Sequence, residues 1–248
     1  MSDPFDSAKR CLSWGKKHVG DFKSRVWDFI ETKPQTTVVE YDSQGICEYH
    51  KIKMVRSLPD ELANIVSDAV QNLRQALDQA CFVLGQFSSI TNPRNTKFPF
   101  ADNDPEFKGR LAKKDFPNDI KPLLASFKPY KGGNDFLWAL NRVCNTNKHD
   151  YLIPALVGCR GTKSLPPEAI NNPDFPLGWH RSHNEFIFAI VRGDKILEYD
   201  GELTFAVTFG EIEVVKGQPV VIILNEFVTI VERILLAIEA EARRLGYI

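Results

Sequence analysis

The stretch SLPDELANIVSDAVQNLRQALDQACFVLGQF, residues 57–87, carries the clearest helical pattern in the chain. Apolar residues recur along it at steps of three and four, and a second apolar series widens the apolar arc to about 160°. Its start has the chemistry of a helix N-terminus, because Pro59, Asp60 and Glu61 follow a serine. An arc this broad predicts a central helix that contacts neighbouring elements on two sides.

The rest of the chain alternates between helical and strand-like patterns. With this segment included, helices are expected at residues 7–31, 57–88, 118–148 and 221–245, the third as two helices near 118–127 and 134–148. Strands are expected at residues 36–55, as a hairpin around the turn 42–45, and at 185–191, 196–199 and 203–209. Residues 91–117 and 158–184 are rich in Pro, Gly or Asn and are expected to form loops. The sequence thus predicts one α+β domain over residues 1–248, mainly a helical bundle with a small antiparallel sheet.

The composition is that of an ordinary folded protein without a strong charge bias. Apolar residues make up 43% of the chain, and the formal net charge is −1. A near-neutral chain argues against a general coat for nucleic acids, which needs a broad excess of Lys and Arg. A local basic surface stays open, because residues 105–131 carry seven basic and three acidic side chains. Charge runs usually form a solvated helix face, and that interpretation is favoured.

Cysteine usage and hydropathy predict where the protein works. The chain has five cysteines, which are scattered and never spaced as Cys-x-x-Cys. This pattern favours reduced thiols over a disulfide framework or a structural zinc site. The first residues contain no apolar signal core, and polar residues interrupt the most apolar tract, 220–238. We therefore expect a soluble cytoplasmic protein that does not enter the membrane.

Two polar clusters place charged residues inside otherwise apolar helices. They are Asn72-Leu-Arg74-Gln-Ala-Leu-Asp78 and Asn145-Thr-Asn-Lys148-His149-Asp150. One interpretation is a polar network that joins two helices, with Asp78 bonded to Lys148 or His149 and Arg74 to a carbonyl. The other is a phosphate and proton-transfer site, in which Arg74 and Lys148 hold phosphate and His149 moves a proton. The structural network is favoured, because ion-pair networks also place charges inside helices.

Three motifs resemble a widespread family of bacterial proteins without an established activity. They are residues 68–78 (DAVQNLRQALD), Phe98-Pro-Phe100, and residues 140–149 (LNRVCNTNKH). Family members show D-A-x-H-N-L-R-S-A-L-D-H, then F-P-hydrophobic, then L-N-x-x-x-x-K-H, so the likeness covers roughly residues 55–155. Two histidines of the family pattern are replaced here by Gln71 and Gln79. Roles that depend on those histidines are therefore not expected in this chain.

A more distant resemblance is to HEPN domains, helical bundles that often act as metal-independent ribonucleases. Their Arg-x(4–6)-His motif is matched by Arg142 and His149, which six residues separate. Such a match arises about once by chance in a chain of this composition, so it is a weak motif by itself. Val143 also stands where those nucleases usually carry a polar residue.

Other chemical motifs carry little weight. His180 and His183 have His-x-x-His spacing, but surrounding Pro and Gly predict a loop, and surface histidines are the favoured interpretation. No Walker phosphate loop, Gly-x-Gly-x-x-Gly or Gly-x-Ser-x-Gly is present. Neither a metal nor another cofactor is expected.

Two functions are therefore expected, and the first is favoured over the second. The first is a non-catalytic helical-bundle protein that binds a nucleotide, RNA or a protein partner, with a homodimer through the long helices as a possible form. The alternative is a HEPN-like ribonuclease of a toxin or phage-defence system. In it, His149 would act as general base while Arg142 or Arg74 stabilises the phosphorane charge with Lys148. The binding residues expected in either case are Asn72, Asp78, Asn145 and Lys148.

Overall fold

The protein is an α+β fold in which helices dominate, as the sequence predicts. The computed structural model describes residues 3–87, 93–145, 152–160, 178–180, 185–192, 202–210 and 212–248. The helices are α1 (Asp6–Glu31), α2 (Asp60–Phe87), α3 (Asp104–Lys113), α4 (Lys121–Ser126), α5 (Asp135–Asn145) and α7 (Val220–Arg244), with a 3-10 turn, η1, at Pro93–Thr96. The strands are β1 (Gln35–Tyr41), β2 (Cys47–Met54), β3 (Leu152–Arg160), β4 (Gly178–His180), β5 (Glu185–Arg192) and β6 (Glu202–Phe209).

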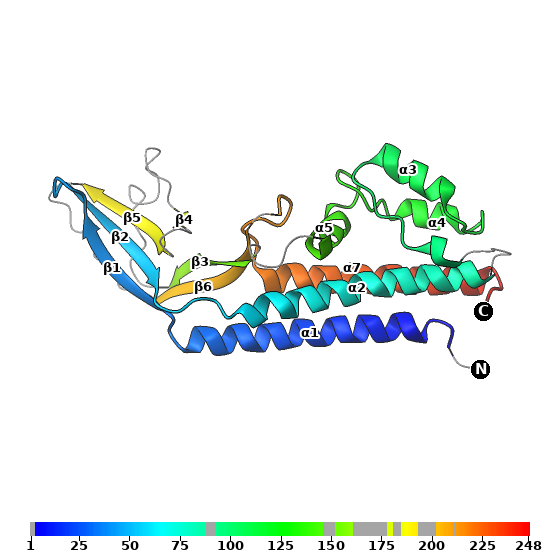
Figure 1. Ribbon diagram of the computed structural model, residues 1–248, viewed down its shortest axis with the longest axis horizontal. Helices are drawn as coiled ribbons and strands as arrows, with labels where there is room; N and C mark the ends of the chain where they lie inside the picture. Colours follow the sequence, from blue (N-terminus) through cyan, green and yellow to red (C-terminus); the bar gives the residue numbers. More distant parts are fainter. Residues whose placement is uncertain are drawn as a thin grey trace. The chain divides into compact units, whose positions relative to one another are not determined.

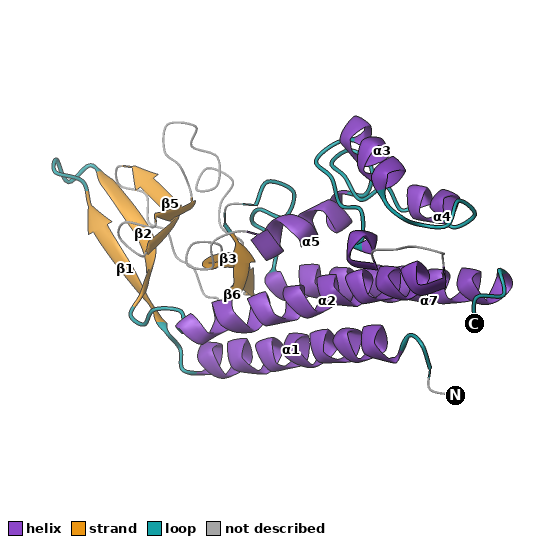
Figure 2. Cartoon of the chain, turned by 45° about the vertical axis from the view of Figure 1, so that its right-hand side comes forward, coloured by secondary structure: helices purple, strands orange, loops and turns teal. Residues whose placement is uncertain are grey.

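The chain divides into two compact units. Unit 1 contains residues 1–23, 60–151 and 209–248, and unit 2 contains residues 24–59 and 152–208. Figures 1 and 2 show the helices of unit 1 and the strands of unit 2 from two directions. A single domain over residues 1–248 is expected from the sequence, and this expectation stays a prediction.

Helices α2 and α7 form the centre of unit 1 and run side by side in both views (Figures 1 and 2). Leu73 and Leu77 of α2 are fully buried, and so is Val231 of α7, because the apolar arc of each helix faces its neighbours. The predicted boundaries of both helices are right to within three residues. The start of α2 at Asp60, not at residue 57, follows from Pro59, since the residue before a proline is disfavoured in the helical conformation.

The part of α1 that belongs to unit 1 packs on α2 and α7 through an apolar seam. Its buried positions are Phe5, Ala8, Leu12, Gly15, Val19 and Phe22, which alternate steps of three and four. Helices α1 and α2 approach so closely at Gly15 that a Cβ atom there would lie only 2.7 Å from Leu73 Cδ2. Lys16 pairs with Glu232 of α7 at 2.6 Å on the outer side of this seam. Close packing therefore depends on the missing side chain of Gly15.

The expectation of a loop over residues 91–117 is wrong for α3. Asn103 caps this helix, since its Oδ1 accepts the Glu106 N–H at 3.0 Å. Glu106 Oε2 accepts the Asp102 N–H at 2.8 Å, a bond that resembles a capping box but reaches the residue before the N-cap. Pro105 suits a first helical turn, where no partner for its missing N–H is needed. The Asp-Pro pair that indicated a loop is thus a helix start.

Unit 2 contains a four-stranded antiparallel sheet in the order β1-β2-β5-β4, and β3 pairs with β6. The predicted hairpin is confirmed: Tyr41 pairs with Glu48, and Asp42 Oδ1 accepts the Ile46 N–H in the turn. The loop expected at 158–184 is wrong where β3 and β4 lie, because these segments gain strand partners that local composition does not reveal. The strand expected at 196–199 lies outside the described residues.

Two lysines and two glutamates form an ion-pair network across three strands of this sheet. Lys51 Nζ lies 2.7 Å from Glu40 and 2.9 Å from Glu185. Lys53 also pairs with Glu40, and lies 3.7 Å from Glu185. Hydrogen bonds from Lys51 and Lys53 lower the pKa of Glu40 to about 2. The network therefore links β1, β2 and β5 through charges that are present at neutral pH.

Hydropathy gives no sign of a membrane span: within the described ranges, no helix has both the length and the apolar character that crossing a bilayer requires.

Candidate functional site

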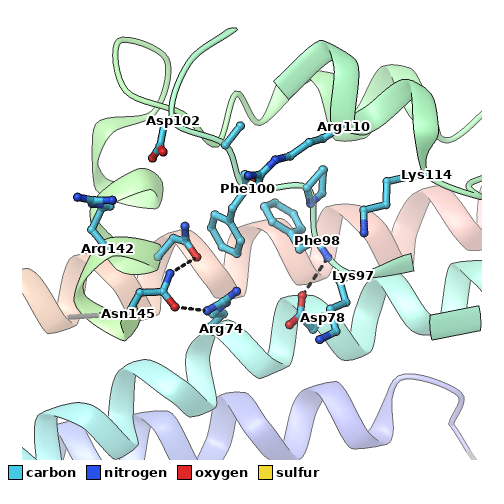
Figure 3. A pocket seen from close by; sticks show the side chains of 13 residues that line it. Arg74, Asp78, Lys97, Phe98, Phe100, Asp102, Arg110, Lys114, Arg142 and Asn145 are labelled. Carbon is cyan, nitrogen blue, oxygen red and sulfur yellow. Dashed lines mark hydrogen bonds between the residues drawn. The ribbon is translucent and has the colours of Figure 1, made fainter. Parts of the chain in front are cut away.

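A pocket of about 480 Å³ opens in unit 1 between α2, α3, α5 and the segment that joins η1 to α3. Positive side chains dominate its lining: Arg74, Lys97, Arg110, Lys114 and Arg142. The acidic residues in the lining are Asp78 and Asp102, which leaves an excess of three positive charges. In Figure 3, Arg142 and Asn145 lie on one side of Phe98 and Phe100, with Lys97 and Lys114 on the other. Such a cavity favours an anionic ligand.

The floor of the pocket is a buried aromatic loop. Phe98 and Phe100 are 4% and 3% exposed, so Phe98-Pro-Phe100 forms a buried plug. Their rings contact each other with centroids 4.9 Å apart. The Phe100 carbonyl also accepts a hydrogen bond from Arg110 Nη1, which fixes this loop to α3. A rigid apolar floor holds the surrounding charges in position and lowers the local dielectric.

Arg74 reaches from α2 to α5. Its Nη1 donates to Asn145 Oδ1 at 3.0 Å, and its guanidinium lies 5.7 Å from the centre of the Phe100 ring. Nε of Arg74 is buried and has no hydrogen-bond partner among the described residues. An unsatisfied buried donor on a cation is costly, and a bound anion would remove that cost.

Asp78 lies one turn after Arg74 on α2 but does not pair with it. Its Oδ1 accepts the Phe98 N–H at 2.9 Å, a bond that joins α2 to the aromatic loop (Figure 3). Burial raises the pKa of this carboxyl group, although the Phe98 N–H and nearby Arg74 act in the opposite direction. Although Arg74 and Asp78 have i,i+4 spacing, they form no ion pair because each side chain bonds a different neighbouring segment.

Helix α3 brings two further cations to the pocket. Arg110 Nη2 pairs with Glu106 at 2.6 Å, so this guanidinium is already neutralised in part. Lys114, just after α3, forms no ion pair within the described part of the chain. Burial lowers the pKa of Lys114; Asp78 and Cys81 act in the opposite direction, and the positive charges of Lys97 and Arg110 lower the pKa by smaller amounts. Like charges that are held together in this way favour a ligand of opposite charge.

Helix α5 supplies the opposite wall. Asn134 caps it by accepting the Leu137 N–H at 3.0 Å, and its polar face carries Arg142 and Asn145 into the pocket. The Arg142 guanidinium lies 5.5 Å from the centre of the Trp138 ring. Trp138 Nε1 in turn donates to Asp102 at 3.2 Å, so Asp102 is anchored to this wall. The indole of Trp138 therefore helps to position the Arg142 guanidinium.

Four of the residues that the sequence singles out converge on the pocket: Arg74, Asp78, Arg142 and Asn145. Asn72 does not, because its Nδ2 donates to the Asp68 carbonyl at 2.8 Å on the surface of α2. Lys148 and His149 lie outside the described residues, so the proposed bonds from Asp78 to them stay predictions. Arg74 contacts the side-chain oxygen of Asn145, where a carbonyl partner was expected.

Sequence interpretation missed three cations and one acid of this pocket. Lys97, Arg110 and Lys114 line it together with Asp102. Two of these cations fall in the basic run of residues 105–131, which was interpreted as a solvated face. The density of basic residues in this run was the signal available in the sequence. Other basic residues of the run, such as Lys108 and Lys113, are exposed, so the interpretation as a solvated face holds for part of it.

Comparison with protein families, with curated proteins and with solved structures finds no match. Within the ranges that the structure describes, no cluster of three or more His, Cys, Asp or Glu side chains could hold a metal ion. The site is therefore interpreted from its own geometry, as a cationic pocket with an aromatic floor.

Proposed function

We propose that the protein is a non-catalytic binding protein, and that its pocket holds the phosphate of a nucleotide or of a nucleotide unit in RNA. The observation that carries this proposal is the convergence of five cationic side chains on one pocket. Arginine and lysine are the side chains that most often hold phosphate in proteins. A volume of about 480 Å³ also lies in the usual range for small-molecule sites.

The unpaired charges are what separate this proposal from a purely structural network. Arg74 and Asn145 do tie α2 to α5, as a structural network would. Lys97 and Lys114, however, have no acidic partner within ion-pair distance among the described residues, and their positive charges repel each other on one side of the pocket (Figure 3). A network that served stability alone would pair these charges. Positive charges that repel each other in the folded protein are typical of a site that binds an anion.

Calorimetric titration of the full chain with uridine 5′-monophosphate, adenosine 5′-monophosphate and inorganic phosphate tests the proposal. We expect the nucleotides to bind, and Lys114→Gln to weaken them about tenfold, since a hydrogen bond to a charged group is lost. Lys113→Gln is the matched control, because this neighbouring lysine is exposed and does not line the pocket. Equal effects of the two variants, or no binding by the parent protein, would refute the proposal.

A second candidate is the HEPN-like ribonuclease, because Arg142 and Arg74 of the predicted catalytic set line the same pocket. In this candidate, both arginines stabilise the phosphorane charge and His149 is the general base. The test is cleavage of a labelled single-stranded RNA in the presence of a chelator. The candidate requires that His149→Ala and Arg142→Gln abolish cleavage while the melting temperature changes little. Binding without cleavage would leave the first proposal alone.

A further inference from the structure

Asp78 is a carboxylate at the wall of a pocket whose other charges suit phosphate. A negative charge next to a phosphate site weakens phosphate binding, so Asp78 reduces the very affinity that its neighbours provide. It also lies on α2 beside Arg74, which bonds Asn145 and not Asp78. The acid therefore does not serve to neutralise that arginine.

The hydrogen bonds of Asp78 leave one carboxylate oxygen available. Oδ1 accepts the Phe98 N–H at 2.9 Å, and this bond fixes the orientation of the carboxyl group. No other donor among the described residues bonds to it. Lys97 and Lys114 are close enough to influence its pKa, yet neither lies within ion-pair distance in the described structure. Oδ2 can therefore accept a hydrogen bond from a ligand in the pocket.

The proposed ligand must offer a donor near its phosphate. An ionised carboxylate only accepts hydrogen bonds, so it requires an O–H or N–H on the ligand. In a nucleoside 3′-phosphate, and at each linkage of RNA, the ribose 2′-hydroxyl is the donor next to the phosphate, whereas the base edge lies beyond the sugar. Arg74 and Asp78 are one helical turn apart, about 5–6 Å between Cβ atoms. A ligand that contacts both side chains must therefore carry its donor close to its phosphate. Carboxylates bind ribose hydroxyls in this way in dinucleotide-binding folds.

We infer that Asp78 accepts a hydrogen bond from the ribose 2′-hydroxyl, so that the pocket selects ribonucleotides over 2′-deoxyribonucleotides. This inference rests on the proposed function, since the phosphate must first bind among the cations. The 2′-hydroxyl is also the group by which proteins distinguish RNA from DNA. Asp78 is thus the specificity-determining residue, and the cations supply affinity.

The burial of Asp78 is consistent with this role. Because burial raises its pKa, the ionised carboxylate costs the folded protein stability at neutral pH. A hydrogen bond from a ligand hydroxyl would offset part of that cost, because it replaces a hydrogen bond to water that burial removes. Without a ligand role, an asparagine would hold the Phe98 N–H equally well and avoid the buried charge.

The test is a titration of the full chain with three matched ligands: uridine, 2′-deoxyuridine and 2′-fluoro-2′-deoxyuridine 3′-monophosphates. The 2′-fluoro compound keeps a small polar atom but has no donor. We expect the ribonucleotide to bind about tenfold more tightly than the other two, the usual effect of one charge-assisted hydrogen bond. The same comparison with ten-residue oligouridylate and its 2′-deoxy counterpart distinguishes RNA from the free nucleotide as the preferred source.

Asp78→Asn keeps an acceptor for the Phe98 N–H and removes the negative charge. It should lose the preference for ribose and bind the deoxynucleotide more tightly than the parent does. Asp68→Asn is the control, because Asp68 lies exposed on the same helix. Equal binding of all three ligands by the parent overturns the inference but leaves the proposed function. Absence of binding by any of them refutes both.

Discussion

Single side chains decide the packing of unit 1, and Gly15 shows this most directly. It lies in the seam of α1, where a Cβ atom would come within 2.9 Å of Leu73 Cγ. Leu73 is fully buried on α2. The seam is thus as closely packed as a protein core, and added volume there must displace a helix.

Gly15→Ala should lower the free energy of unfolding by about 1–3 kcal/mol, the usual cost of adding volume to a packed core. Gly20→Ala is the matched control in the same helix, because nothing lies within 4 Å of its Cβ position. That variant should be neutral or stabilising by about 0.5–1 kcal/mol, since alanine favours helices. Urea denaturation of both variants measures the difference. A Gly15→Ala protein as stable as Gly20→Ala would show that the seam is loose.

Asp78 should behave as a residue kept for a ligand. Its folded-state pKa is raised, so its stabilising contribution is present below its ordinary value of 3.8 and is lost as the pH rises. Asp78→Asn should therefore increase stability at neutral pH, and the increase should vanish in acid. Asp78→Ala should be less stable than Asp78→Asn by about 1–3 kcal/mol, because the Phe98 N–H loses its acceptor. Thermal denaturation at both pH values tests this, and a loss in Asp78→Asn as large as in Asp78→Ala would contradict it.

At the scale of single residues, the sequence identifies four of the residues that line the pocket. Arg74 and Asp78 stand out because charges interrupt an apolar helix, Asn145 because it begins the second polar cluster, and Arg142 because of its Arg-x(6)-His spacing. The partners could not be predicted, since Phe98 N–H is twenty residues from Asp78 and every backbone amide looks alike in sequence. Lys97 and Lys114 were missed because nothing in the sequence distinguishes a lysine that lines a pocket from one on the open surface.

Elements were predictable where their periodicity is long. The sequence yields α1, α2 and α7 with nearly correct ends, since each repeats its apolar pattern over six turns or more. Helix α3 was missed because its ten residues bury only Phe107 and Leu111, too few for a pattern. Its capping residue, Asn103, was the available signal. Strands β3 and β4 depend on pairing with distant segments, which a local pattern does not encode.

The cap of α3 should matter to the pocket, because this helix carries Arg110 and leads into Lys114. Asn103→Ala removes the acceptor for the Glu106 N–H and should destabilise the helix by about 1 kcal/mol. We expect faster amide exchange in α3 and weaker nucleotide binding, by about two- to fivefold. Asn103→Asp keeps an acceptor at the cap and is the control. If amide exchange in α3 is the same in Asn103→Ala and in the parent, the cap does not hold this helix.

The sheet of unit 2 should lose stability in acid through Glu40. Its folded-state pKa of about 2 lies below its ordinary value of 4.5, so its contribution is complete above 4.5 and is lost as the pH falls toward 2. Glu40 is 42% exposed, so solvent screens the effect and only its direction is predicted. The urea midpoint of the β1 and β2 amide signals should fall between about pH 5.5 and pH 3. Glu40→Gln should show a smaller fall, and an equal one would exclude this residue as the cause.

For the whole molecule, the distribution of charge matters more than its sum. The chain carries a formal net charge of −1, while the pocket has an excess of three positive charges. Composition thus argues against a general nucleic-acid coat but not against a local anion site. Composition averages over 248 residues, and only the fold brings Lys97, Lys114 and Arg142 to one place. A homodimer through the long helices stays a prediction from sequence.

The most direct test of the central claim is an NMR titration of the isotope-labelled full chain with uridine 5′-monophosphate. If the cationic pocket binds the phosphate, the amide signals that shift should be those of residues 97–102, Lys114 and Asn141–Asn145. The shifts should weaken when salt is raised from about 50 to about 200 mM, because the cations of the site are screened. Shifts confined to other parts of the chain, or no saturable shifts at all, would contradict the account.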